Sequence, residues 1–153
     1  MQKRIAMIGG GNMAAALVVG LIADGVDPVS VDVLDRNVDK CERLHKLYGV
    51  NVHECAGDWL SQADVIVLAV KPQGLAKTIK EIKHLFRKEA LFISIAAGIR
   101  VADISRWLGS NKVVRAMPNT PAQVNAGVVG WYAPLNLSDD EKALARKVIQ
   151  AMG

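Results

Sequence analysis

The chain has 153 residues, of which 51% are hydrophobic and 22% are charged, a balance that excludes an intrinsically disordered protein and suits one domain with a sizeable core. The net charge of +4 permits anionic ligands, phosphorylated cofactors included, but does not single out nucleic acid. The two cysteines, Cys41 and Cys55, are too few for a disulfide framework, so we expect a reducing, cytoplasmic setting.

The opening stretch joins an apolar strand to a glycine-rich turn. Residues 3–8 run into the pattern Gly9-x-Gly11-x-x-Ala14, and a small-residue, helix-favouring segment follows. In a dinucleotide-binding βαβ unit, Gly9 permits the sharp turn, Gly11 leaves room for a pyrophosphate, and Ala14 lets the helix pack closely on the strand. The free amides at the helix N-terminus then attract the phosphates. Because residues 9–12 interrupt the apolar run, we expect neither a signal peptide nor a membrane span.

The second predicted strand, residues 29–34, ends at a charged pair. Asp35 follows it 21 positions after Ala14, near the ~20-residue spacing at which an acidic residue reaches the adenosine ribose. Asp35 favours the ribose hydroxyls of NAD, whereas Arg36 favours the 2′-phosphate of NADP because a guanidinium binds phosphate in bidentate fashion. The alternative is a loop in which Asp35 only caps the next helix and Arg36 is solvated.

Hydrophobic periodicity predicts the remaining elements. The predicted helices cover residues 38–48, 74–88 and 101–108, a short helical turn lies at 58–60, and a capping box at 138–141 opens a last helix that stops at Gly153. The predicted strands cover residues 50–53, 64–70, 91–95, 112–117 and 127–131. Because strands and helices alternate, we predict an α/β fold, a doubly wound, mostly parallel, Rossmann-like sheet in which residues 1–153 form one dinucleotide-binding domain.

Two other patterns have ordinary structural interpretations. Cys41, His45, His53 and Cys55 are metal-ligand types, but they lack the usual pair spacing of zinc sites, so we predict surface histidines, packed or exposed thiols and no metal. The basic stripe on the predicted helix 74–88 lacks the aromatic residues that stack bases, so we predict a solvated face and no nucleic-acid partner.

Small or polar residues follow five of the predicted strands. Because the carboxyl ends of parallel strands meet at one edge of a sheet, these segments are expected to converge at one ligand crevice. The five segments are residues 9–13, 35–37, 70–72, 96–98 and 118–120.

Four motifs, in chain order, resemble pyrroline-5-carboxylate reductase. They are IGGGNMA at 8–14, AVKPQ at 69–73, ISIAAGI at 93–99 and VRAMPNTPA at 114–122. The resemblance covers essentially the whole chain. It implies an oxidoreductase of L-proline biosynthesis that transfers a hydride from NAD(P)H to the C=N bond of the small-molecule substrate 1-pyrroline-5-carboxylate.

The same resemblance implies a set of cofactor-binding residues. NADPH is the expected cofactor and NAD is possible, because Asp35 stands where many relatives have an uncharged residue. The expected pyrophosphate residues are Ile8, Gly9, Gly10, Gly11, Asn12 and Met13, and the expected adenosine residues are Asp35, Arg36 and Asn37. The nicotinamide side is expected at Ala69, Val70, Lys71, Pro72, Ala96 and Ala97, with Asn119 at the edge shared with substrate.

The resemblance also implies a further strand and a helical domain after Gly153, which form the dimer or larger homo-oligomer and bind the substrate carboxylate. This domain is absent from the chain, and no residue present is a convincing acid. We therefore name no catalytic residue and expect the chain to bind NAD(P)H but to turn over little substrate alone. The alternatives are a non-catalytic NAD(P)-sensing module, a methyltransferase, or another reductase, either a hydroxyacid dehydrogenase or a deazaflavin-dependent NADP reductase. The motif at 117–122 argues against both other reductases.

Overall fold

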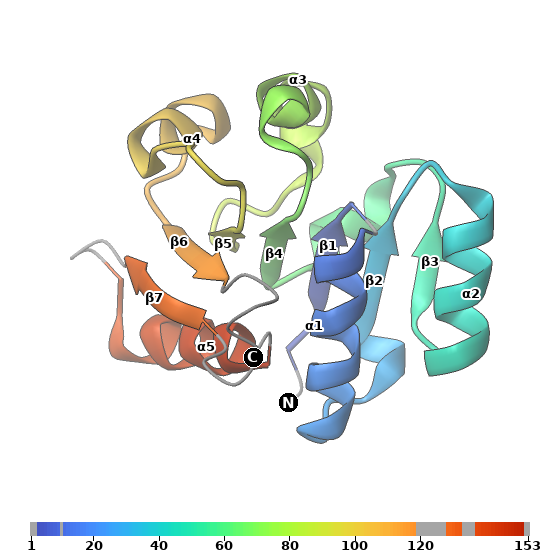
Figure 1. Cartoon of the computed structure of the whole chain (residues 1–153). Helices are drawn as coiled ribbons and strands as arrows, with labels where there is room; N and C mark the ends of the chain where they lie inside the picture. Colours follow the sequence, from blue (N-terminus) through green and yellow to red (C-terminus); the bar gives the residue numbers. More distant parts are fainter. Residues whose placement is uncertain (1–2, 10, 119–127, 133–136, 152–153) are drawn as a thin grey trace.

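A seven-stranded sheet forms the centre of the computed structural model, which describes residues 3–9, 11–118, 128–132 and 137–151 (Figure 1). The strand order within these residues is β3-β2-β1-β4-β5-β6-β7. The first six strands are parallel, and β7 pairs with β6 in the antiparallel direction. The predicted doubly wound, mostly parallel sheet is therefore confirmed. The strands are β1 (Ile5–Ile8), β2 (Val31–Leu34), β3 (Asn51–His53), β4 (Val65–Leu68), β5 (Leu91–Ser94), β6 (Val113–Pro118) and β7 (Val128–Tyr132).

Helices cover both faces of the sheet. Figure 1 shows α3 and α4 together on one side of the sheet and α1 and α5 on the other. The α-helices are α1 (Asn12–Ala23), α2 (Val38–Tyr48), α3 (Pro72–Ile82), α4 (Val101–Leu108) and α5 (Asp139–Gln150). Short 3-10 helices lie at η1 (Pro28–Ser30), η2 (Asp58–Gln62) and η3 (Lys83–Leu85). Among the described residues, no helix is long and apolar enough to cross a membrane.

The core has two layers because alternate residues of each strand point to opposite faces. In β1, Ile5 and Met7 pack with α1 and α5, whereas Ala6 and Ile8 pack with α3 and α4. All four residues of β4 are completely buried. This explains the unalternating apolar run that predicted a central strand covered on both sides.

Helix ends match the expected signals at most positions. α2 begins and ends as predicted, with Asn37 accepting a hydrogen bond from the Lys40 amide at 3.1 Å and Gly49 in the left-handed conformation. α4 also has its predicted bounds. The predicted start of α3 at Gly74 is wrong, because α3 begins at Pro72, whose fixed φ and missing N–H suit the first helical turn.

The predicted start of β2 at Val29 is also wrong. Residues 28–30 form η1, in which the Asp27 carboxylate accepts a hydrogen bond from the Val29 amide at 3.1 Å, and the strand begins at Val31. The side chain of Asp27 therefore competes successfully with the strand for this backbone amide.

The capping box of α5 is confirmed and also ties the helix to β6. The Ser138 hydroxyl accepts from the Glu141 amide at 3.1 Å, and the Glu141 carboxylate accepts from the Ser138 amide at 2.9 Å. Lys112, immediately before β6, places its Nζ 2.8 Å from the same carboxylate. Partial burial alone would raise the pKa of Glu141, but the hydrogen bonds from Lys112 and Ser138 outweigh it and lower the pKa. The predicted stop of α5, Gly153, lies outside the described residues.

Candidate cofactor-binding site

The carboxyl ends of the central strands lie side by side at one edge of the sheet. Ile8 pairs with Leu34 on one side and with Leu68 on the other, and Leu68 pairs in turn with Ser94. The order reverses at β1, since the chain leaves β1 toward β2 and β3, and leaves β4 toward β5 and β6. This is the topological switch point at which open α/β sheets bind ligands. The predicted convergence of the loops after β1, β2, β4 and β5 is therefore present.

Gly9 lies where the turn after β1 meets the segment after β4. Its φ is +105°, a left-handed value that strains any residue with a side chain. A Cβ atom at Gly9 would lie 3.0 Å from the carbonyl oxygen and 3.1 Å from the carbonyl carbon of Ala69. Glycine is thus required both for the backbone conformation and for the close approach of the two segments.

Gly11, unlike Gly9, is not crowded by any described residue. A Cβ built on Gly11 meets no described atom within 4 Å, so its lack of a side chain leaves space above the start of α1. Gly11 caps α1 without a side-chain hydrogen bond, and the first turn of the helix has no acidic residue. The positive end of the α1 dipole therefore faces this space, an arrangement that fits a diphosphate. Ala14 is buried against β1, as the motif requires.

A second helix begins at the same edge. Lys71 is the N-cap of α3, with an extended backbone and an exposed side chain, and Pro72 is the first helical residue. α3 also has no acidic residue in its first turn and no side-chain cap. The site therefore combines two helix N-termini with the cationic side chains of Lys71 and Arg36, which makes this edge favourable for an anion.

The loop after β2 is held by its own polar residues. Asp35 accepts a hydrogen bond from the Asn37 amide at 2.8 Å, and Asn37, not Asp35, caps α2. The alternative in which Asp35 caps the helix is therefore wrong. Arg36 is solvated, with 87% of its side chain exposed, and its Nη2 lies 3.8 Å from Oε2 of Glu81 in α3.

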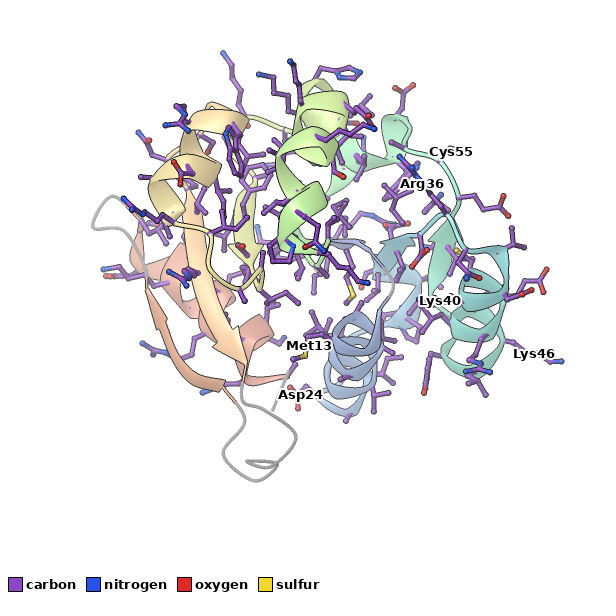
Figure 2. All side chains as sticks on the ribbon, turned by 45° about the horizontal axis from the view of Figure 1, so that its top comes forward. Met13, Asp24, Arg36, Lys40, Lys46 and Cys55 are labelled. Carbon is purple, nitrogen blue, oxygen red and sulfur yellow. The ribbon has the colours of Figure 1, made fainter. Side chains whose placement is uncertain are left out.

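The Cys41 side chain is in contact with the loop after β2. Its thiol donates to the Asp35 carbonyl oxygen at 3.3 Å, and burial, followed by the nearby Asp35 carboxylate, raises its pKa. Both effects disfavour the thiolate. Cys41 is thus a packed, protonated thiol, whereas Cys55 is exposed (Figure 2).

The expected nicotinamide side divides into residues that reach the surface and residues that do not. Ala97 is exposed and Val70 is half-buried, but the Ala96 side chain is buried against the α3 and α4 face. The side chain of Ile8 is buried on the same face. Ile8 and Ala96 can therefore contact a cofactor only through their backbones, which stays a prediction.

The structure describes only some of the remaining predicted site residues. Asn12 begins α1, and Met13, half-buried in its first turn, is labelled in Figure 2. Gly10 and Asn119 lie outside the described residues, and so does the rest of the predicted loop at 119–120.

One polar cluster was not predicted. Asp32 is buried in β2, and its carboxylate lies 2.9 Å from the Arg4 guanidinium and 3.0 Å from Nε2 of His53. His53 also stacks on Trp59, with ring centroids 3.8 Å apart. His53 is half-buried, with 26% of its side chain exposed, whereas His45 is exposed as predicted. A carboxylate inside an otherwise apolar strand was the available signal, because a buried charge needs a partner. The described residues include no group of three or more His, Cys, Asp or Glu that could hold a metal ion.

Comparison with known proteins places this geometry in a family. The family profile described as NADP oxidoreductase, coenzyme F420-dependent, matches residues 4–98, from β1 through the loop after β5. The chain belongs to this family. The match to the coenzyme F420-dependent family covers the switch-point loops and stops before the motif at 114–122.

Within this NADP oxidoreductase family, the chain is similar to pyrroline-5-carboxylate reductases, as the motifs predicted. It is 45% identical to the pyrroline-5-carboxylate reductase of Escherichia coli, covering 100% of this chain and 58% of that protein. The solved structure of the enzyme from Coxiella burnetii superposes with a TM-score of 0.91 at 40% identity, covering 100% of this chain and 57% of that one. The chain thus spans a little over half the length of these relatives.

A more distant solved structure shares the fold. Pyrroline carboxylate reductase from Plasmodium falciparum, solved with NADP bound, superposes with a TM-score of 0.78 at 23% identity, covering 99% of this chain and 55% of that one. The fold of this family member therefore extends to relatives with little sequence in common.

Proposed function

We propose that this chain is the NADPH-binding half of a pyrroline-5-carboxylate reductase, an enzyme that reduces the C=N bond of 1-pyrroline-5-carboxylate to give L-proline. The observation that carries the proposal is the contrast between two glycines of one turn. A Cβ at Gly9 would meet the Ala69 peptide, whereas a Cβ at Gly11 would meet no described atom within 4 Å, at a helix start without a side-chain cap. Such a turn is shaped to hold a diphosphate against backbone amides.

In this proposal, separate groups of residues lie beside the diphosphate, the adenosine ribose and the nicotinamide of the cofactor. The turn from Gly9 to Met13 holds the diphosphate, and Asp35, Arg36 and Asn37 lie beside the adenosine ribose. The segments 69–72 and 96–97 form the wall on the nicotinamide side. When bound, the nicotinamide supplies the hydride, and the chain contributes binding, orientation and a positive local field.

The proposal includes the setting of the enzyme. We place it in the cytoplasm, supported by the two free cysteines, and expect the full-length protein to be a homo-oligomer that takes a small-molecule substrate. Because no proton donor is identified in this chain, we expect it to bind NADPH and to form proline slowly on its own.

A binding titration of two glycine variants tests the proposal. The purified chain should bind NADPH, followed by cofactor fluorescence, and should not bind S-adenosylmethionine. In Gly11→Ala the new methyl group meets no described atom within 4 Å, so folding should survive while NADPH affinity falls about tenfold or more, the equivalent of one lost charge-assisted hydrogen bond.

The matched control is Gly20→Ala, at the other end of the same helix. Gly20 lies nine residues after Gly11, about 13 Å along the helix axis, and is expected to alter stability but not NADPH affinity below the unfolding temperature. Unchanged NADPH affinity in Gly11→Ala, or equal losses in both variants, would contradict the proposed diphosphate site.

A further inference from the structure

We propose that Glu81 is a specificity-determining residue that weakens the preference of this site for NADPH over NADH. It does so by competing with the cofactor 2′-phosphate for the guanidinium of Arg36. The inference rests on the proposed function, because it requires the adenosine ribose to lie beside Arg36. Glu81 lies in none of the motifs of the sequence, and its role comes only from the fold.

The geometry brings together two residues that are 45 positions apart in the chain. Arg36 follows β2, and Glu81 is the penultimate residue of α3. Their closest atoms, Nη2 and Oε2, lie 3.8 Å apart, within ion-pair range but too far for a direct hydrogen bond. The side chains are 87% and 47% exposed. The pair is therefore a weak, solvated contact that a stronger acceptor can replace.

A 2′-phosphate is such an acceptor. It carries close to two negative charges and can accept two parallel N–H bonds from the planar guanidinium, whereas Glu81 holds one edge of that group at long range. To bind the phosphate in this way, Arg36 must leave Glu81. The Glu81 carboxylate then remains near the phosphate as a like charge, which disfavours NADPH a second time.

Neither the loss of the Arg36–Glu81 pair nor the repulsion by Glu81 applies when NADH binds. It has a ribose hydroxyl in place of the 2′-phosphate, so Arg36 can stay with Glu81 while the ribose is bound. The Glu81 carboxylate is therefore expected to lower NADPH affinity while leaving NADH affinity nearly unchanged. This makes the ratio of the two affinities, not either value alone, the quantity to measure.

The experiment compares Glu81→Gln with Glu89→Gln in the full chain. Glu89 is the matched control, since it is 67% exposed and lies 4.0 Å from Arg87 in a similar surface pair, before the amino end of β5. The dissociation constants for NADPH and NADH are measured at low salt and at 0.5 M salt. Glu81→Gln is expected to tighten NADPH about two- to fivefold at low salt, the range of an exposed ion pair, and to leave NADH unchanged. High salt should remove most of the gain.

A third variant shows whether the effect runs through Arg36. In an Arg36→Ala background, Glu81→Gln should give a clearly smaller gain, because the competition no longer exists. An unchanged NADPH constant in Glu81→Gln, an equal gain for NADH, or the same gain in Glu89→Gln would each overturn the inference. Those outcomes leave the proposed function intact as long as the parent chain binds NADPH and Gly11→Ala binds it about tenfold or more weakly. Failure of the parent chain to bind either dinucleotide would overturn both.

Discussion

The packing of α1 on the end of α5 predicts an unusual stability effect at Gly20. A Cβ at this position would lie 1.8 Å from the carbonyl oxygen and 2.8 Å from the carbonyl carbon of Ala151. Both obstructing atoms are backbone, so they cannot rotate away as a side chain would. Gly20→Ala therefore forces the two helices apart by more than an ångström, and overpacking of this kind costs about 1–3 kcal/mol.

Helix propensity acts in the opposite direction. Alanine is better than glycine inside a helix by about 0.8–1 kcal/mol, so the net loss for Gly20→Ala should be up to about 2 kcal/mol. In a protein of this size that lowers the melting temperature by up to roughly 8 °C. Thermal unfolding followed by circular dichroism measures it directly.

Gly74→Ala is the matched control for this experiment. Gly74 lies in the first turn of α3, and a Cβ there would meet only Val70 Cγ1 at 3.6 Å, an ordinary contact. This variant should be neutral or stabilising by up to ~1 kcal/mol. If Gly20→Ala raises the melting temperature as Gly74→Ala does, the close contact between α1 and residue 151 is refuted.

Three further predictions concern charged and thiol groups. Arg36→Ala should weaken NADPH binding about tenfold, the value of a lost charge-assisted contact, and NADH binding much less; equal losses would show that Arg36 does not contact the 2′-phosphate. Because the pKa of Glu141 is lowered on folding, its carboxylate stabilises the protein above its unfolded pKa and this contribution disappears as the pH falls through the folded pKa. Glu141→Gln should therefore be less stable than the parent by up to ~1 kcal/mol at pH 7, through the lost pair with Lys112, and this difference should shrink as the pH falls below the unfolded pKa and vanish below the folded pKa of Glu141; a constant difference in denaturant midpoints would contradict this. An alkylating reagent should modify Cys55 quickly and Cys41 slowly, since Cys41 is buried with a raised pKa, and similar rates would be inconsistent with that burial.

Local signals were sufficient for much of the fold. α2 and α4 were predicted to the residue because each has a clear apolar stripe and ends at a left-handed glycine, Gly49 or Gly109. The starts of α3 and β2 were misplaced for local reasons too. Pro72 can end one element and open the next, and the Asp27 carboxylate takes an amide from residues with strong strand propensity.

Only the features of the site that follow from the order of the strands could be predicted from the sequence. Parallel strands place their carboxyl ends at one edge, so the meeting of the loops after β1, β2, β4 and β5 follows from the alternation of elements. The contact of Arg36 with Glu81 cannot be derived from the alternation of elements, because it depends on how α3 lies relative to the loop after β2. The same limit applies to His53, whose partner Asp32 lies on the neighbouring strand.

The contact between Gly9 and residue 69 has a consequence for redesigning the site. The atoms that crowd Gly9 belong to the peptide group of Ala69, not to its methyl group. Small changes to the side chain at 69, which is only partly buried, should therefore leave the shape of this turn, the proposed diphosphate site, unaltered. Position 9 offers no such freedom. A mutant library for altered cofactor use should diversify residue 69 and keep residue 9 fixed.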